Sequence, residues 1–375
     1  MSQPRKFFII AGEVSGDIHG ALLMGAMKQE EPDCEFSGIG GHRMELNGLA
    51  SLFPLEKMSV MGFVEVLKHL NFFKNVEKRV LETIATEKPE RIILIDYPGF
   101  NLRLAQKVKR KFNIPITYYI SPQIWAWKEK RISIIRQYID QMLVIFPFEK
   151  KWYAERGVDV EWVGHPYIEE WKPSSTKSEL KTQLGLISDK PLLTLFPGSR
   201  KQELNNHLKV CFEAVKLIQA ELDDVQIVLG LAPNVDIASI RIPENIVVEK
   251  NNPRRALEAA DAAIVASGTS TLEAAIYGIP MVIIYKMNFL SWWISKLLVK
   301  SKFAGMPNLI ADRIIVPELL QSQATGPAIS KLIIRIINPS LSRDNILQNL
   351  NNVREALGDG IASSRAASFI LGNYS

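Results

Sequence analysis

Several apolar stretches of the sequence end in turns whose residues could bind a phosphate or move a proton. The run AIVASGTSTLEAAIYGIPMVIIY, residues 263–285, reads as strand, turn, helix and strand, and small residues form its turn. Such a turn lets a ligand approach the backbone, supplies hydroxyl donors, and directs unpaired N–H groups at an anion, typically phosphate. We therefore predict an anion site at Gly268, Thr269 and Ser270.

The same turn also has a purely structural interpretation. Ser270 and Glu273 have the spacing of a capping box, in which a hydroxyl and a carboxylate satisfy the first N–H groups of a helix. Open parallel sheets place ligand sites at the carboxyl ends of their strands, which favours binding. The motif taken singly leaves both interpretations open.

A second turn of this kind opens the second half of the chain. A strand is predicted at Leu192–Phe196 and a helix from Lys201, with Ser199 and Gln202 spaced to cap it. Arg200, in the turn between them, carries a planar, permanently charged group that suits a diphosphate. The alternative is an ordinary surface arginine, although its position directly after an apolar strand favours the functional interpretation.

A carboxylate follows another predicted strand. Asp96 ends the stretch RIILID, and the turn Tyr97–Asn101 comes next. A carboxylate at the carboxyl end of a parallel strand can take a proton from a hydroxyl group held there. The alternative is an aspartate that only caps the turn.

The turns after two other strands of the first half carry further candidates. Glu13, Ser15 and Asp17 follow the first strand and could contact a sugar or phosphate, or could cap and pack the turn. That turn has neither the GxGxxG spacing of a dinucleotide site nor the GK[ST] of a P-loop. Trp125, with Trp127 nearby, could stack on a sugar or could pack under its loop.

Length and composition limit the class of protein. A chain of 375 residues exceeds the usual size of one core, so two α/β domains are expected. The net charge of +5 is too small to indicate nucleic-acid binding by itself. Cys34 and Cys211 are far apart, no cluster has metal-ligand spacing, and no signal peptide precedes the first strand, so we expect an intracellular protein without disulfide or metal.

The elements that must position these residues follow a strand–turn–helix pattern. We predict a first domain at 1–172, a linker at 173–190 and a second domain at 191–341, with a loop at Met306–Leu309 and only helices after Pro317. The predicted strands are Lys6–Ala11, Cys34–Gly41, Arg91–Asp96, Ile116–Ile120, Met142–Phe146, Val158–Val163, Leu192–Phe196, Gln226–Leu229, Asn245–Val248, Ala263–Ala266 and the one that ends at Tyr285.

Two segments combine apolar and basic residues. Residues 58–76 have helical spacing with more apolar residues than a narrow core stripe needs, and residues 287–303 contain two tryptophans and three lysines. The second is too short to span a bilayer but suits the membrane interface. A helix buried against its own domain is the alternative for both.

The motifs together resemble one family. AGEVSGDIHGA, GIGGHRM, VMGFVEVL, IDYPGFN, YYISPQIWAW, FPFE, WVGHP, LFPGSR, VASGTSTLEA, KLLVK and MPNL occur in an order similar to that of the lipid-A-disaccharide synthases, across nearly all of the chain. The resemblance implies an α/β protein of the GT-B fold, with two Rossmann-like domains facing a central cleft. It also implies that C-terminal helices, here 342–375, return to the first domain.

The resemblance implies an inverting glycosyltransferase of Gram-negative lipid A synthesis. It would transfer 2,3-diacylglucosamine from UDP-2,3-diacylglucosamine to 2,3-diacylglucosamine 1-phosphate, forming a β-1,6-linked disaccharide and UDP without a cofactor. Members of the family tend to dimerise and to associate peripherally with the cytoplasmic side of the inner membrane, which for this chain would involve 58–76 and 287–303.

The implied site residues follow position by position. Asp96 matches the candidate general base and Arg200 a residue needed for activity; the expected donor-binding residues are Ser199, Gly268, Thr269, Ser270, Glu273 and Asn308, with Glu273 at the ribose hydroxyls, and those of the acceptor side are Glu13, Ser15, Asp17 and Trp125. Gly99 stands where many members have aspartate, so Asp96 is the only acid in its turn.

Two other functions fit parts of the pattern. Another UDP-sugar enzyme of this architecture, such as a UDP-N-acetylglucosamine 2-epimerase, would act on an unacylated donor. A lipid- or nucleotide-binding protein without turnover would bind the UDP-sugar but release no UDP.

Overall fold

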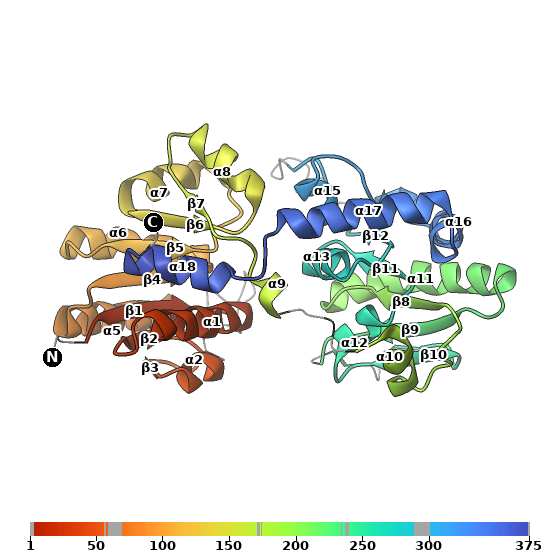
Figure 1. The fold of residues 1–375 in the computed structure, drawn as a ribbon, viewed down its shortest axis with the longest axis horizontal. Helices are drawn as coiled ribbons and strands as arrows, with labels where there is room; N and C mark the ends of the chain where they lie inside the picture. Colours follow the sequence, from red (N-terminus) through yellow and green to blue (C-terminus); the bar gives the residue numbers. More distant parts are fainter. Residues whose placement is uncertain are drawn as a thin grey trace. The chain divides into compact units, whose positions relative to one another are not determined.

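The computed structural model describes residues 4–55, 58, 70–170, 173, 175–233, 235–236, 240–288 and 301–373. The chain divides into two compact units (Figure 1). The first unit consists of Met1–Glu169 and Leu357–Ser375, and the second unit of Glu170–Ala356.

The first unit is built on a parallel sheet of seven strands in the order β3-β2-β1-β4-β5-β6-β7. Strands such as β1 (KFFIIA) and β4 (RIILI) are apolar almost throughout, as strands buried on both faces of a sheet must be. Its elements are β1 Lys6–Ala11, α1 Val14–Glu30, β2 Glu35–Ile39, α2 His42–Leu46, β3 Leu49–Ser51, α5 Leu70–Glu87, β4 Arg91–Ile95, α6 Pro98–Lys111, β5 Ile116–Tyr119, the 3₁₀ helix η1 Glu129–Arg131, α7 Ile132–Tyr138, β6 Gln141–Val144, α8 Pro147–Ala154, β7 Glu161–Trp162, α9 Tyr167–Glu170, which crosses into the second unit, and α18 Ala362–Leu371.

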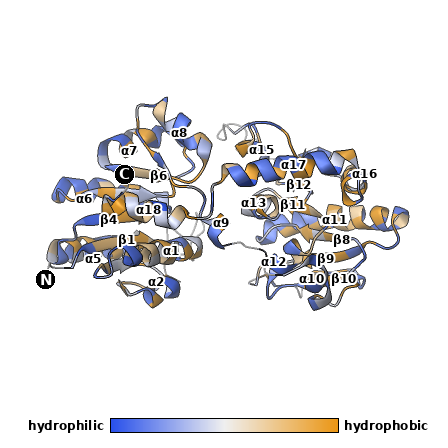
Figure 2. Ribbon diagram, in the orientation of Figure 1, coloured by the Kyte–Doolittle hydropathy of each residue, from blue (hydrophilic) through white to orange (hydrophobic). Residues whose placement is uncertain are grey.

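The second unit repeats this construction with six parallel strands in the order β10-β9-β8-β11-β12-β13. Hydrophobic residues concentrate on the strands and on the inner faces of the helices (Figure 2). Its elements are α10 Lys177–Gln183, β8 Leu192–Phe196, α11 Lys201–Glu221, β9 Gln226–Gly230, β10 Ile246–Glu249, α12 Pro253–Glu258, β11 Ala262–Ala266, α13 Thr269–Ile276, β12 Met281–Tyr285, α15 Met306–Ile310, β13 Glu318–Leu320, the 3₁₀ helix η2 Gln321–Gln323, α16 Gly326–Ile337 and α17 Leu341–Ala356.

The strand order reverses once in each sheet, and the reversals locate the candidate sites. In the first unit the chain runs outward on one side through β2 and on the other through β4, so the reversal lies between β1 and β4. In the second unit it lies between β8 and β11. Ligands of such sheets bind outside the carboxyl ends of the strands at the reversal. The turns after these four strands contain most of the residues selected from the sequence.

The end of the chain returns to the first unit. Helix α18 packs against α1 and is drawn in blue among the red and orange elements of that unit (Figure 1). Ser363 donates hydrogen bonds from its N–H and its hydroxyl to the carboxylate of Glu169, at 2.7 and 2.6 Å. The structure places this return at Leu357, later than the predicted 342, because α17 packs on α13 and α16 of the second unit.

Several predicted element assignments differ from the structure. Helix α10 lies within the predicted linker 173–190 and belongs to the second unit, where Thr176 and Glu179 form its capping box. Residues predicted as a loop form α15, with Pro307 in its first turn. The short edge strands β3 and β13 were not predicted, since three residues give too little pattern to detect.

The predicted apolar-basic segments 58–76 and 287–303 lie largely outside the described residues. Of the first, Phe73 and Val76 on α5 are buried in the core of the first unit, as the buried-helix alternative expects for that part. None of the helices in the described part of the chain has the length and hydropathy to span a bilayer.

Candidate functional site

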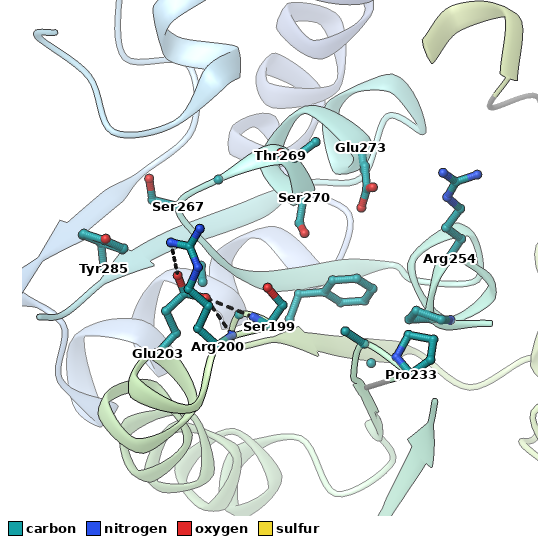
Figure 3. A pocket seen from close by; sticks show the side chains of 17 residues that line it. Ser199, Arg200, Glu203, Pro233, Arg254, Ser267, Thr269, Ser270, Glu273 and Tyr285 are labelled. Atoms are coloured by element: carbon teal, nitrogen blue, oxygen red, sulfur yellow. Dashed lines mark hydrogen bonds and ion pairs between the residues drawn. The ribbon is translucent and has the colours of Figure 1, made fainter. Parts of the chain in front are cut away.

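Two turns of the second unit line one open pocket of about 430 Å³. They are Gly198–Arg200 after β8 and Ser267–Ser270 after β11, so predicted residues that are far apart in the sequence lie together here (Figure 3). The pocket is lined by Phe196, Gly198, Ser199, Arg200, Glu203, Gly230, Ala232, Pro233, Pro253, Arg254, Ala266, Ser267, Gly268, Thr269, Ser270, Glu273 and Tyr285.

The N-terminus of α13 faces this pocket. The helix begins at Thr269, after Gly268, whose φ of 149° favours glycine. The capping box predicted from Ser270 and Glu273 does not form, because Ser270 already lies in the first turn and no side chain caps the helix. The structure therefore leaves these small residues at the pocket wall, where a helix N-terminus favours an anion.

The Arg200 turn is fixed by two side chains of α11. Glu203 accepts hydrogen bonds from the N–H groups of Ser199 and Arg200, at 3.0 and 3.3 Å, and takes the place of the predicted Ser199–Gln202 cap. His207 is buried, and its Nδ1 donates to the Pro197 carbonyl at 2.6 Å while its Nε2 accepts from Lys286 N–H at 2.8 Å. The neutral imidazole thus ties the turn to the end of β12.

The Arg200 side chain itself is 84% exposed. Its Nη1 lies 3.8 Å from a carboxylate oxygen of Glu203, which is the ion pair drawn in Figure 3. Such an exposed pair contributes little to stability, so the guanidinium can turn to an anion in the pocket at small cost.

Glu273 lies across the pocket beside an arginine that the sequence analysis missed. Burial raises the pKa of Glu273 to about 7; the charge of Arg254 opposes this and that of Glu170 adds to it. Arg254 Nη1 donates to Glu170 Oε1 at 2.8 Å. A signal for Arg254 does exist in the sequence, because Asn252-Pro253-Arg254 is a further strand–turn–helix junction, after β10.

Asn308, which was predicted to contact the donor, does not lie in the pocket. It is fully buried and outside the pocket lining. Its Oδ1 accepts from the N–H groups of Ile315 and Val316, and its Nδ2 donates to the Val316 carbonyl and to Glu318. An asparagine amide has two donors and two acceptor positions, so all of its hydrogen-bonding capacity is used inside the fold.

The Asp96 turn in the first unit holds an unusual backbone. Asp96 and Tyr97 have φ of 41° and 48°, a left-handed conformation that residues with a side chain rarely adopt. Asn101 Nδ2 donates to the Ile95 and Asp96 carbonyls at 3.2 and 2.8 Å, and the Tyr118 hydroxyl donates to the Asp96 carbonyl as well. These buried groups hold the turn in place.

The Asp96 carboxyl group is suited to proton transfer near neutral pH. Burial raises its pKa to about 7, the charge of Glu13 raises it further, and the Tyr97 N–H opposes both. A general base is most effective when its pKa lies near the working pH. Asp96 and Glu13 follow β4 and β1, the two strands at the reversal of the first sheet.

The other acceptor-side candidates separate into different roles. Asp17 is buried and caps α2, because its carboxylate accepts from the N–H groups of Gly41, Arg43 and Met44 at 2.8 to 3.1 Å. This is the structural alternative considered for the turn. Ser15 is half-buried at the start of α1.

Trp125 is oriented by a carboxylate that the sequence analysis also missed. Its Nε1 donates to Glu149 Oε1 at 3.1 Å, and its ring meets that of Phe148 edge to face. Glu149 is fully buried and also accepts from Ser121 and from the N–H groups of Ile145 and Phe146. Burial raises the pKa of Glu149 to about 7, against these four donors. FPFE, one of the recognised motifs, contained this signal.

Within the described ranges, no group of three or more His, Cys, Asp or Glu side chains is arranged to hold a metal ion. The pocket instead offers a guanidinium and a helix N-terminus, which bind anions directly.

The fold is similar to those of a UDP-GlcNAc 2-epimerase and of a glycosyltransferase. UDP-GlcNAc 2-epimerase from Neisseria meningitidis, solved with UDP-GlcNAc, aligns with a TM-score of 0.67 at 12% identity, covering 98% of this chain and 100% of the other. The calicheamicin glycosyltransferase aligns with a TM-score of 0.62 at 14% identity, covering 100% and 98%. The class is therefore the GT-B fold of two Rossmann-like domains, and at such identities the likeness shows the fold alone.

Sequence comparison narrows this class to one family. The lipid-A-disaccharide synthetase family matches residues 7–369. Lipid-A-disaccharide synthase of Myxococcus xanthus is 39% identical over 377 residues, covering 99% of this chain and 98% of the relative. Lipid-A-disaccharide synthase 1 of Legionella pneumophila is 37% identical over 367 residues, covering 96% of each. The chain belongs to the lipid-A-disaccharide synthase family.

Proposed function

We propose that this protein transfers 2,3-diacylglucosamine from UDP-2,3-diacylglucosamine to 2,3-diacylglucosamine 1-phosphate. The observation that carries the proposal is the pocket of the second unit, where Arg200, the α13 N-terminus and Glu273 converge in a chain of this family. A diphosphate is recognised by arginine and by a helix N-terminus, and the ribose hydroxyls by a carboxylate.

In this proposal Asp96 is the general base of a direct displacement. The acceptor's 6-hydroxyl gives its proton to the Asp96 carboxylate while its oxygen forms a bond to the donor's anomeric carbon. The bond from that carbon to the UDP oxygen breaks, and its electron pair leaves with UDP. Attack opposite the leaving group inverts the anomeric centre and gives the β-1,6 linkage.

The second unit would stabilise the departing UDP. Negative charge grows on the diphosphate as the glycosidic bond breaks, and groups already oriented towards that charge lower the barrier. Arg200 and the N–H groups at Gly268–Ser270 take this role, with Ser199 beside them and Glu273 at the ribose. No step in this scheme needs a cofactor.

The substrates also imply the protein's surroundings. Both carry acyl chains, so we propose that the protein acts at the cytoplasmic surface of the inner membrane, through 58–76 and 287–303, and that two copies associate. The acceptor side would be formed by Glu13, Ser15 and Trp125, with Asp17 fixing the neighbouring α2.

The test is UDP release in detergent with UDP-2,3-diacylglucosamine as donor, with and without 2,3-diacylglucosamine 1-phosphate. Release that depends on the acceptor, together with a new disaccharide phosphate seen by mass spectrometry, is the expected result. Binding of donor without release would contradict the proposal. Epimerisation of unacylated UDP-N-acetylglucosamine under the same conditions would favour the epimerase instead.

A further inference from the structure

The turn that follows β11 in the second unit is hydrogen-bonded at both of its ends to the loop Ala304–Met306. Ser267 Oγ donates to the Ala304 carbonyl at 2.6 Å. At the other end, Met306 N–H donates to Thr271 Oγ1 at 3.1 Å, and that hydroxyl donates to the Gly268 carbonyl at 2.8 Å. Thr271 is fully buried and is not among the pocket-lining residues. The loop Ala304–Met306 therefore sets where the turn lies.

A single carboxylate holds this loop. Glu318, at the start of the edge strand β13, accepts from Ala304 N–H and Gly305 N–H, each at 2.9 Å. The loop also passes very close to the sheet, since a Cβ on Gly305 would lie 2.1 Å from Ile283 Cδ1. The backbone thus fits against β12 with its N–H groups directed at Glu318.

Asn308 adds a third hydrogen bond to the Glu318 carboxylate. Its Nδ2 donates to Glu318 Oε1 at 2.8 Å, and its remaining bonds go to the backbone of Ile315 and Val316. Because these bonds use its whole capacity, Asn308 cannot face a ligand without breaking the fold around it. Within this network its side chain contacts Glu318 directly.

We infer that Glu318 is a positioning residue of the nucleotide site, which orients the Ser267–Ser270 turn through the Ala304–Met306 loop, and that Asn308 acts through it. This rests on the proposed function in one respect, that UDP binds at that turn. Glu318 accepts three N–H donors and donates none, a pattern that a carboxylate meets and an amide does not.

The test is the affinity for UDP, measured by calorimetry on the full-length protein carrying Glu318→Gln. The glutamine has nearly the same shape, but its NH₂ group opposes an N–H group of the loop, so the loop and the turn must shift. We expect the Kd for UDP to rise about tenfold, the scale of one misplaced buried hydrogen bond. A Kd within about twofold of wild type would overturn the inference, since an equal Kd means an equal binding free energy.

Asp261→Asn is the matched control for a general loss of stability. Asp261 is a carboxylate of the same sheet that accepts from Leu192 N–H and from Lys181 Nζ, at 2.9 and 2.7 Å. It comes just before the amino end of β11, whereas the turn follows the carboxyl end of that strand. Its replacement should lower the unfolding temperature and leave the Kd for UDP unchanged. A matching loss of affinity in Asp261→Asn would show that the Glu318 effect is only destabilisation.

A second pair decides the matter if Glu318→Gln does not fold. Thr271→Val keeps the shape of the side chain and removes the hydroxyl that joins the turn to the loop, whereas Thr271→Ser keeps it. We expect weaker UDP binding in the first variant and near-wild-type binding in the second. Equal affinity in both would overturn the inference. If the wild-type protein itself binds no UDP, the proposed donor site fails, a result distinct from wild-type binding that Glu318→Gln leaves unchanged.

Discussion

The Asp96 turn of the first unit and the Ser267–Ser270 turn of the second follow equivalent strands but are built in opposite ways. The Asp96 turn has two consecutive non-glycine residues in the left-handed region, held by the side chains of Asn101 and Tyr118. The other turn has a glycine, an exposed threonine and two half-buried serines, and the Ala304–Met306 loop supports it through hydrogen bonds.

The difference follows from what each turn is proposed to do. A proton acceptor has to be one carboxyl group in one place, partly desolvated so that its pKa approaches neutrality, and a strained, well-supported backbone provides that. A diphosphate needs several N–H groups and room for its oxygens, which small residues at a helix N-terminus provide. Each turn can be tested separately.

The largest expected effect is at Asp96. Asp96→Asn should lower turnover about 1,000-fold, because the amide cannot take the acceptor's proton. The measurement is disaccharide formation at saturating substrates. Asp140→Asn is the control, because Asp140 comes just before β6, at the opposite ends of the strands from the Asp96 turn, and it should keep most of the activity. Near-normal turnover of Asp96→Asn would refute the base assignment.

Arg200 should have the next largest effect. Arg200→Ala should lower kcat/KM roughly 100-fold, through lost stabilisation of the departing diphosphate. The unfolding temperature should not change, because the side chain is 84% exposed. Arg200→Lys should recover only part of the activity, since an ammonium does not reproduce the guanidinium fork. Full recovery with lysine would show that only charge matters there.

Glu273 should affect the nucleotide and not the proton transfer. Glu273→Gln should weaken UDP binding about tenfold, the cost of losing a charged hydrogen-bond acceptor at the ribose. The loss should be smaller for 2′-deoxy-UDP, which lacks one of the hydroxyls. Equal losses for the two nucleotides would place Glu273 away from the ribose.

The pH dependence distinguishes the two turns further. Because burial raises the pKa of Asp96 to about 7, turnover should increase as pH rises through about 7, where the carboxyl becomes a base. Glu13→Gln should move this increase in turnover to lower pH, since it removes a charge that raises the Asp96 pKa. Rate–pH profiles of the two proteins test this, and an increase unmoved by Glu13→Gln would contradict the electrostatic coupling.

The raised pKa of Asp96 also makes the stability of the folded protein depend on pH. The folded pKa is above the ordinary value of 3.8, so this group contributes stability at low pH that is lost as pH rises through about 7. Asp96→Asn should therefore unfold at a higher temperature than wild type above neutral pH. If the unfolding temperature of Asp96→Asn instead exceeded that of wild type by more as the pH fell, the result would contradict the raised pKa.

The smallest effect is expected at Gly99, next to the strained turn. A Cβ there would have no atom within 4 Å, whereas a Cβ on Gly12 would lie 2.3 Å from the Tyr97 ring. Gly99→Asp, which introduces the aspartate that the family resemblance implies at this position, should change turnover by no more than about twofold, as exposed substitutions usually do. Gly12→Ala should reduce it clearly, because Tyr97 would have to move.

The sequence was enough to predict the strands and the turn residues of the candidate sites, but not most of the side chains that hold those turns in place. Strands β1 and β8 were predicted with their observed bounds, because long apolar runs between turn residues are unambiguous. The small residues of the pocket were also recognisable in the sequence. Glu318 and His207 were not, since their partners come from other elements and no local pattern records such contacts. Glu149 was missed although its contact with Phe146 N–H is local and lies within the FPFE motif.

The sequence also suggested ligand contacts for two residues whose hydrogen bonds the structure places inside the fold, Asn308 from the family resemblance and Asp17 from its turn. Asn308 and Asp17 lie in motifs of the family, yet both use their hydrogen bonds inside the protein. The capping box predicted from Ser270 and Glu273 is the converse case, since its spacing is correct but the N-cap is Gly268 and the helix begins two residues earlier than the box requires.

The central claim is that proton transfer belongs to the first unit and nucleotide binding to the second. The most direct test is a calorimetric titration of UDP into the purified Asp96→Asn protein. The account predicts an affinity within about twofold of wild type, an energy difference below 0.5 kcal/mol, alongside the loss of turnover. A weakening of about tenfold or more, equivalent to 1.4 kcal/mol, would show that Asp96 takes part in nucleotide binding and would contradict the division.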